Sequence, residues 1–307
     1  MSIQEKKGTA EDSEKTFSFS VSTRRLTPLQ IVELFDRAGR RNELSSVFGF
    51  MDESPLNGGR TRADSLHVPP DEIEKLNGMG IGYSFTLTNT AVAAEHLKDA
   101  HTNEMLKRFE NPLNSVIIAM PLVADYIRER YPRYRLRASC LCNFNTAEEI
   151  NDACGRFDMV TPWPEINENE ELLGKLKFKD RIMLFGSQAC LRNCINNRLR
   201  HYYFCSLDHI MYYNHRQYGV SYHPKDFEWP FPSFCRGKDT PVRLADLEKF
   251  RRMGFTKIKI VHPAQFAEHT LGIPPSPTGK MMSFVRTKIL KQYPPVEVGQ
   301  CARLPKK

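Results

Sequence analysis

Short apolar segments rich in β-branched and aromatic residues recur along the chain and alternate with segments of helical periodicity. The apolar segments predict eight strands, at residues 17–22, 45–50, 82–87, 115–120, 135–140, 159–163, 182–185 and 257–261. The helical patterns lie at residues 28–38, 70–77, 95–109, 122–130, 146–154 and 244–253. Strands that alternate with helices pair in parallel, so the pattern predicts an α/β fold.

The number of strand–helix units favours one α/β architecture. Eight such units within about 250 residues fit a closed (β/α)8 TIM-like barrel, which we expect over residues 17–272. An open doubly wound sheet is the alternative, because strand counts from one sequence err easily. The first predicted strand is not followed by Gly-x-Gly-x-x-Gly, and the chain has no Gly-x-x-x-x-Gly-Lys-Ser, so a nucleotide-binding sheet has no motif support.

Three segments stand apart from the predicted barrel units. Residues 1–16 are polar and without an apolar signal region, which predicts a disordered tail, and residues 273–307 form a Pro- and Lys-rich C-terminal extension. Residues 202–241 follow the seventh strand and are rich in proline and aromatic residues. Long insertions at the active face of a barrel are typically lids or binding loops, so we expect a lid here.

Charge and cysteine content narrow the class of protein. The formal net charge of +8 permits an anionic substrate or RNA such as tRNA, although charge alone is a weak indication. No segment approaches eighteen consecutive apolar residues, so we expect no membrane span. The eight cysteines are too dilute for a disulfide scaffold, and without a recognisable signal sequence we expect a cytoplasmic protein. Clustered thiols in a reducing compartment indicate metal binding, redox chemistry or catalysis.

Four cysteines after the seventh predicted strand form the candidate metal site: Cys190, Cys194, Cys205 and Cys235. The spacing of Cys190 and Cys194 places both sulfurs on one face of a helix. Structural zinc usually takes Cys-x2-Cys pairs, which are absent, whereas iron–sulfur clusters tolerate irregular spacing. We therefore predict a metal-binding insertion with a 4Fe–4S cluster. Zinc is the alternative metal, and buried packing thiols are the alternative without metal.

Polar residues at or just past the predicted strand ends supply candidates for the reactive face. Glu165 and Asp52 are candidate general acids or bases, or hydrogen-bonded scaffold. His201 is a candidate for ligand orientation or proton transfer, or a core histidine. Arg60 and Arg198 are candidates for holding a carboxylate or phosphate, or for surface ion pairs.

Several of these features together resemble one known family. They are the run from Arg181 to Cys194 (Arg-Ile-Met-Leu-Phe-Gly-Ser-Gln-Ala-Cys-Leu-Arg-Asn-Cys), Arg198, His201-Tyr202, Cys235 and the helix and strand at 244–260. They resemble the collagenase-like peptidase family U32, and more closely its barrel-shaped iron–sulfur branch. Arg60, Asn89, Ser139 and Glu165 also fall where that branch tends to carry polar residues, so the resemblance adds Asn89 and Ser139 as substrate-binding candidates.

The resemblance implies a 4Fe–4S cluster held by cysteines. It also implies oxygen-independent hydroxylation of a small molecule such as a ubiquinone precursor, or of tRNA or ribosomal RNA. The sequence departs from the pattern of that branch at two places. Val261-His262-Pro263 stands where an arginine is expected, and Cys205 stands where the branch often has another residue, which would leave three thiolates and one open iron.

Three function classes therefore remain as expectations. The first is an iron–sulfur-dependent, oxygen-independent redox enzyme with hydroxylase-like activity. The second is a non-catalytic accessory subunit, in which a cluster or zinc ties down the insertion and a partner protein performs the chemistry. The third is a peptidase, as the family label implies, although the chain has neither Gly-x-Ser-x-Gly nor His-Glu-x-x-His.

Overall fold

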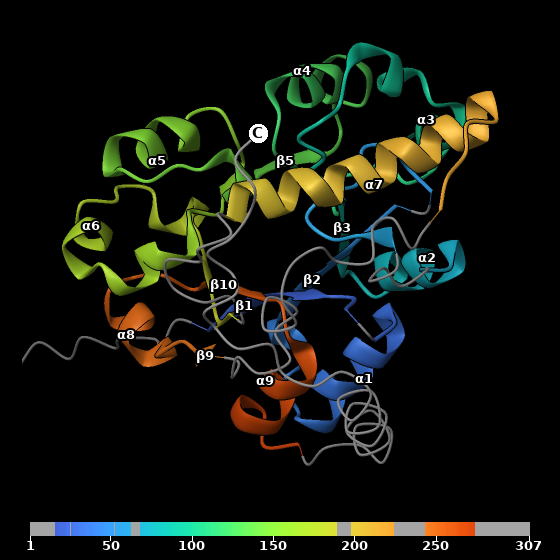
Figure 1. Cartoon of the computed structure of the whole chain (residues 1–307). Helices are drawn as coiled ribbons and strands as arrows, with labels where there is room; N and C mark the ends of the chain where they lie inside the picture. The colour runs from blue at the N-terminus through green and yellow to red at the C-terminus, as the bar shows by residue number, and fades with distance from the viewer. Residues whose placement is uncertain are drawn as a thin grey trace, which may run out of the picture.

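The structure, a computed structural model, describes residues 16–24, 26–51, 53–62, 68–188, 198–223 and 243–273. Eight parallel strands pair in the order β6-β5-β4-β3-β2-β1-β10-β7 (Figure 1). A parallel bridge between Val160 and Ile182 joins the two outer strands of this order and closes the ring. The predicted (β/α)8 barrel is thereby confirmed.

Every predicted strand is present, and the differences are confined to the ends. The barrel strands are β1 (Ser18–Ser22), β2 (Leu44–Gly49), β3 (Gly82–Leu87), β4 (Ser115–Ile118), β5 (Arg135–Ala138), β6 (Met159–Val160), β7 (Met183–Phe185) and β10 (Lys257–Ile260). Two further short strands, β8 (Ser187–Gln188) and β9 (Arg243–Leu244), form a separate antiparallel pair. β8 follows directly on β7, so this pair extends the barrel at the carboxyl end of that strand.

Helices connect the strands. They are α1 (Pro28–Arg37), α2 (Pro70–Gly78), α3 (Ala100–Arg108), α4 (Pro121–Arg130), α5 (Ala147–Cys154), α6 (Glu170–Gly174), α7 (Arg198–Tyr218), α8 (Leu247–Arg252) and α9 (Pro263–Thr270). Short 3-10 turns precede or follow them: η1 (Arg41–Glu43), η3 (Ala94–Lys98), η4 (Cys140–Cys142), η5 (Pro164–Glu168) and η6 (Lys179–Arg181). Helices α1, α3, α5, α6 and α8 each begin at a side-chain N-cap. The predicted capping signal at Thr146 is a capping box with Glu149.

Two predicted helices are shorter than expected because an aspartate caps each of them. Asp99 accepts a hydrogen bond from the Thr102 amide at 2.9 Å, so the predicted helix 95–109 divides into η3 and α3. Asp246 accepts from the Lys249 amide at 3.0 Å, so α8 begins after it and Leu244 belongs to β9.

The apolar core lies between the barrel strands and the surrounding helices. On β1, Phe19 and Val21 point outward and are buried. The ring centroid of Phe19 lies 5.8 Å from that of Phe35 on α1 and 5.0 Å from that of Phe266 on α9. Burial of each such side chain contributes about 1.5–3 kcal/mol to stability. The alternate residues of the same strand therefore point into the barrel.

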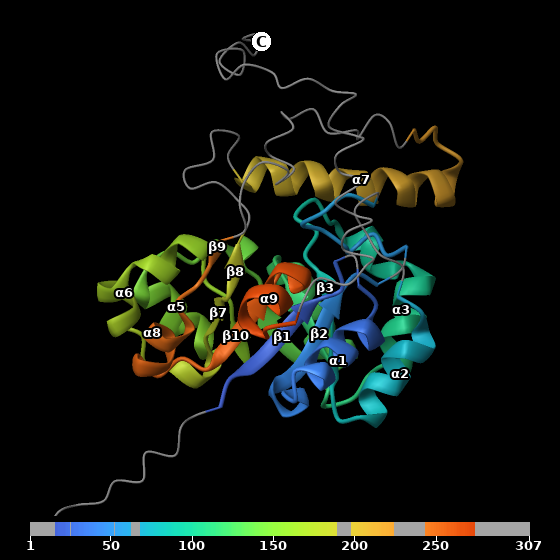
Figure 2. The same cartoon turned by 90° about the horizontal axis from the view of Figure 1, so that it is seen from below.

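Helix α7 lies across the carboxyl ends of the strands (Figure 2). Its 21 residues include most of the described part of the segment predicted to be a lid. A helix of this length spans about 31 Å, enough to cross the end of a barrel. In the part of the chain that the structure describes, no helix combines the length and apolarity needed to cross a membrane.

Candidate functional site

The barrel interior is lined by small polar side chains. Ser20 and Ser46 are joined by a 2.8 Å hydrogen bond between their hydroxyl oxygens, and Ser84 and Ser115 by one of 2.7 Å. All four are buried. Barrel interiors are typically filled by bulky branched residues, so serines at these positions leave room and offer hydroxyl groups.

Arg137 on β5 points into this interior. Its Nη1 donates to Ser20 Oγ at 3.3 Å and to Ser46 Oγ at 3.2 Å. Desolvation, reinforced by the charge of Arg135, lowers the pKa of Arg137 to about 10. The side chain nevertheless keeps part of its accessible surface, so solvent reaches it within the fold.

Lys259 on β10 also points inward, since its neighbours Ile258 and Ile260 are fully buried in the outer core. Its Nζ lies 4.5 Å from the ring centroid of Phe48 and 5.8 Å from that of Phe185. Burial is the main cause that lowers the pKa of Lys259 to about 8; Cys140 opposes this shift and Arg137 adds to it. None of the carboxylates in the described residues forms an ion pair with Lys259 or Arg137.

Arg60 adds a third positive charge at the carboxyl end of the barrel. Its Nη2 donates to Ser22 Oγ, at the end of β1, at 2.8 Å. Its charge also lowers the pKa of Lys259. The structure therefore brings together three cationic side chains from the loop after β2, from β5 and from β10. Such an arrangement attracts an anion.

Hydrogen bonds fix α7 over this end of the barrel. Asn89 Nδ2 donates to the carbonyl oxygens of Pro55 at 2.7 Å and Ser206 at 3.1 Å. The Asp208 carboxylate accepts from the Arg62 amide at 2.6 Å. Asn89 was predicted to bind substrate; in the structure it is fully buried and joins the loop after β3 to the lid helix.

His209 is a buried residue of this interface that the sequence analysis missed. Its Nε2 lies 3.0 Å from the Arg60 carbonyl oxygen, which can only accept, so Nε2 carries the proton. Its Nδ1 is then a lone-pair acceptor, and no described residue hydrogen-bonds to it. Desolvation lowers the pKa of His209 to about 4. In the sequence His209 stands between Asp208 and Ile210, a setting that does not distinguish it from a core histidine.

Of the predicted metal ligands, the structure describes Cys205, which is fully buried on α7 one turn before His209. The other three, Cys190, Cys194 and Cys235, lie outside the described residues. The described residues alone contain no group of three or more His, Cys, Asp or Glu side chains that would hold a metal ion. The 4Fe–4S cluster and the zinc alternative therefore stay predictions.

The remaining predicted site residues lie around the same end of the barrel or outside the described part. Ser139 follows β5, and its Oγ accepts from the Leu141 amide at 3.2 Å. Glu165 lies in η5 after β6, and Arg198 and His201 lie in the first turns of α7. Asp52 is outside the described residues.

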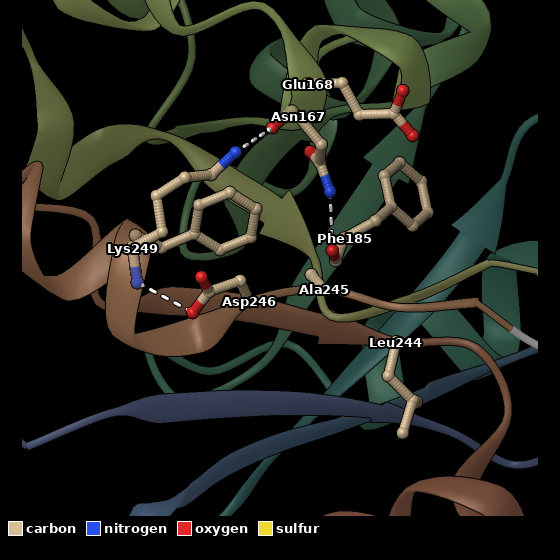
Figure 3. A pocket seen from close by; sticks show the side chains of 8 residues that line it. Asn167, Glu168, Phe185, Leu244, Ala245, Asp246 and Lys249 are labelled. Carbon is tan, nitrogen blue, oxygen red and sulfur yellow. Dashed lines mark hydrogen bonds between the residues drawn. The ribbon is translucent and has the colours of Figure 1, made fainter.

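A cleft lies beside the barrel, between η5, β9 and α8 (Figure 3). It has a volume of about 130 Å³ and is lined by Asn167, Glu168, Phe185, Leu244, Ala245, Asp246, Lys249 and Phe250. Its cation, Lys249, lies 3.4 Å from a carboxylate oxygen of Glu170. The charge of Lys249 is thus compensated within the described part of the chain.

Comparison with known proteins supports the fold. No family model matches the chain, and no curated protein matches it. A solved structure described as the U32 peptidase Mk0906 superposes with a TM-score of 0.51 at 13% sequence identity. The match covers 85% of this chain and 96% of that one. At this identity the likeness concerns the fold.

Proposed function

We propose that the protein is a barrel enzyme that binds an anionic substrate inside the barrel, beneath α7. The observation that carries this proposal is that buried Lys259 and half-buried Arg137 form no ion pair with a carboxylate among the described residues. Burying a charge without compensation is costly, and a bound anion would relieve that cost. The guanidinium of Arg137 suits a carboxylate or a phosphate, whose oxygens accept two parallel hydrogen bonds.

The proposed reaction class is oxygen-independent redox chemistry on a small molecule or an RNA-borne group. Cys205, with Cys190, Cys194 and Cys235, would hold a 4Fe–4S cluster, or alternatively zinc. The position of Cys205 supports this, because its thiol is buried on the helix that covers the barrel. A bound cluster would supply electron transfer, while Arg137 and Lys259 would hold the substrate anion.

A second candidate is peptide hydrolysis, which the description of the structural neighbour as a U32 peptidase favours. The anion in the barrel would then be a carboxylate of the peptide. Both candidates use the same cationic interior, so the anion site is tested first.

Anion binding is expected to raise the melting temperature of the full chain in acetate or phosphate, relative to chloride at equal ionic strength. We expect Arg137→Met and Lys259→Met each to weaken the anion affinity, derived from that rise, by about tenfold or more. Lys107→Met is the control, because Lys107 is exposed on α3. Equal stabilisation of all four proteins would refute the proposed site.

The metal proposal is tested by iron, zinc and acid-labile sulfide content of protein purified without oxygen. We expect Cys205→Ser to lower the bound metal, and Cys142→Ser to leave it unchanged. Cys142 is a suitable control because its Sγ donates to the Ile118 carbonyl at 3.3 Å, a bond that serine also makes. Wild-type protein without iron, zinc or sulfide would contradict both metal assignments.

A further inference from the structure

We propose that Lys259 is a nucleophilic amine that forms an imine with the carbonyl group of an anionic substrate of the 2-oxo acid class. The inference rests on the proposed anion site, because Arg137 and Lys259 would bind neighbouring groups of one small molecule. In a 2-oxo acid the carboxylate and the reactive carbonyl carbon are adjacent. A carboxylate held by Arg137 would therefore present its carbonyl close by.

The sheet register places Lys259 beside the serine that Arg137 contacts. Ser20 on β1 is the register partner of Lys259 on β10, and Arg137 Nη1 lies 3.3 Å from the Ser20 hydroxyl. Phe185 on β7 is the register partner of Lys259 on its other side. Lys259 therefore lies between β1, whose Ser20 contacts Arg137, and β7, which supplies the ring of Phe185.

The surroundings of Lys259 favour the neutral amine. Burial and the charges of Arg137 and Arg60 favour the neutral amine, whereas Cys140 and the rings of Phe48 and Phe185 favour the ammonium form; burial is the largest of the effects on the pKa. With a pKa near 8, about half of the Lys259 side chains are neutral at pH 8. An ordinary lysine is neutral in well under 1% of molecules at that pH, and desolvation beside another cation is a known means of activating such an amine.

Solvent-accessible space remains around Lys259 and its neighbours inside the barrel. The exposed fraction of Lys259 is 7%, whereas Ile258 and Ile260, its neighbours along the strand, are 0% exposed. Arg137 and Cys140 are also partly accessible. The four serines that replace bulky residues inside the barrel account for this space.

The reaction needs no further reagent. The neutral Nζ of Lys259 attacks the carbonyl carbon, so a C–N bond forms and the C–O π bond breaks; one Nζ proton is transferred to the oxygen to give a carbinolamine. Loss of the hydroxyl with a second proton, as one water molecule, leaves the C=N bond. No group is oxidised or reduced in this step.

The test is reductive trapping on the full chain with glyoxylate and sodium cyanoborohydride, followed by peptide mapping. We expect a secondary amine at Lys259, which is lost in Lys259→Arg and formed at least about tenfold more slowly in Arg137→Met. Acetate should slow the labelling of Lys259 in the wild-type protein. This measurement needs no variant, so it does not depend on whether a variant folds. Lys107, exposed on α3, is the internal control for non-specific labelling.

The outcomes separate this inference from the proposed function. Stabilisation by acetate without labelling of Lys259, or labelling of Lys259 no faster than of Lys107, would overturn the imine and leave the anion site standing. Absence of both stabilisation and selective labelling would overturn both. Selective labelling of Lys259 that acetate slows would support both.

Discussion

Replacing Gly82 by alanine is expected to lower the free energy of unfolding by about 3 kcal/mol. A Cβ at this position would lie 2.2 Å from the carbonyl oxygen of Leu113 and 3.1 Å from its carbonyl carbon. These are backbone atoms, so no side-chain rotation relieves the contact. Gly82 also pairs with Ser46 at the start of β3, so a backbone shift would disturb the barrel on both sides. Denaturant unfolding of the purified variant measures the effect.

The matched control is Gly78→Ala. Gly78 is the last residue of α2, and a Cβ there would have no atom of the described chain within 4 Å. Alanine is the better helix former, so we expect unchanged stability or a gain of up to about 1 kcal/mol. If Gly82→Ala stays within about 1 kcal/mol of the wild type, the close approach of β3 to Leu113 is not required for folding.

Acidification from pH 7 to pH 5 is expected to cost the folded state roughly 2 kcal/mol through His209 alone. The folded pKa of about 4 lies below the ordinary value of 6.5, so the unfolded chain takes up a proton first as the pH falls. The stability present above pH 6.5 is therefore lost progressively and levels off below pH 4. Unfolding free energies at the two pH values, with hydrogen exchange of α7, measure the loss.

The pH effect is assigned with two variants. His209→Gln removes the titrating group and keeps a donor for the Arg60 carbonyl, so we expect it to reduce the difference between pH 7 and pH 5. His215→Gln is the control, because His215 is exposed on the same helix. The charged neighbours Asp208 and Arg62 are unchanged in both variants. An equal pH dependence in wild type and His209→Gln would show that other groups are responsible.

The barrel was predictable because each strand buries its outward face against a helix. The alternation of Phe19 and Val21 with serines, and of Ile258 and Ile260 with lysines, is the period-two pattern of a half-buried strand. Helix α7 was not predictable in the same way. Its barrel-facing residues include Ser206, Asp208 and His209 rather than an apolar stripe, because they meet a polar surface.

The cationic interior could not be predicted for a related reason. In the sequence, Lys257-Ile-Lys-Ile260 and Arg135-Leu-Arg-Ala138 have the pattern of strands with one face in water. Closure of the ring instead turns Lys259 and Arg137 inward. The polar residues just past strand ends were predictable as a set. The role of each residue depends on its hydrogen-bond partners. The side-chain amide of Asn89, for example, donates to two backbone carbonyl groups.

The apolar core lies outside the ring of strands, so the residues that stabilise the fold differ from those that line the interior. Most small domains must use the same residues for stability and for binding. Side chains such as Phe19, Phe35 and Phe266 keep the ring intact, whereas Ser20 and Ser46 make few contributions to that packing. Substitutions inside the ring can therefore change the preference of the proposed anion site with little loss of foldability. Descendants of such a chain can diversify in specificity while their architecture is conserved.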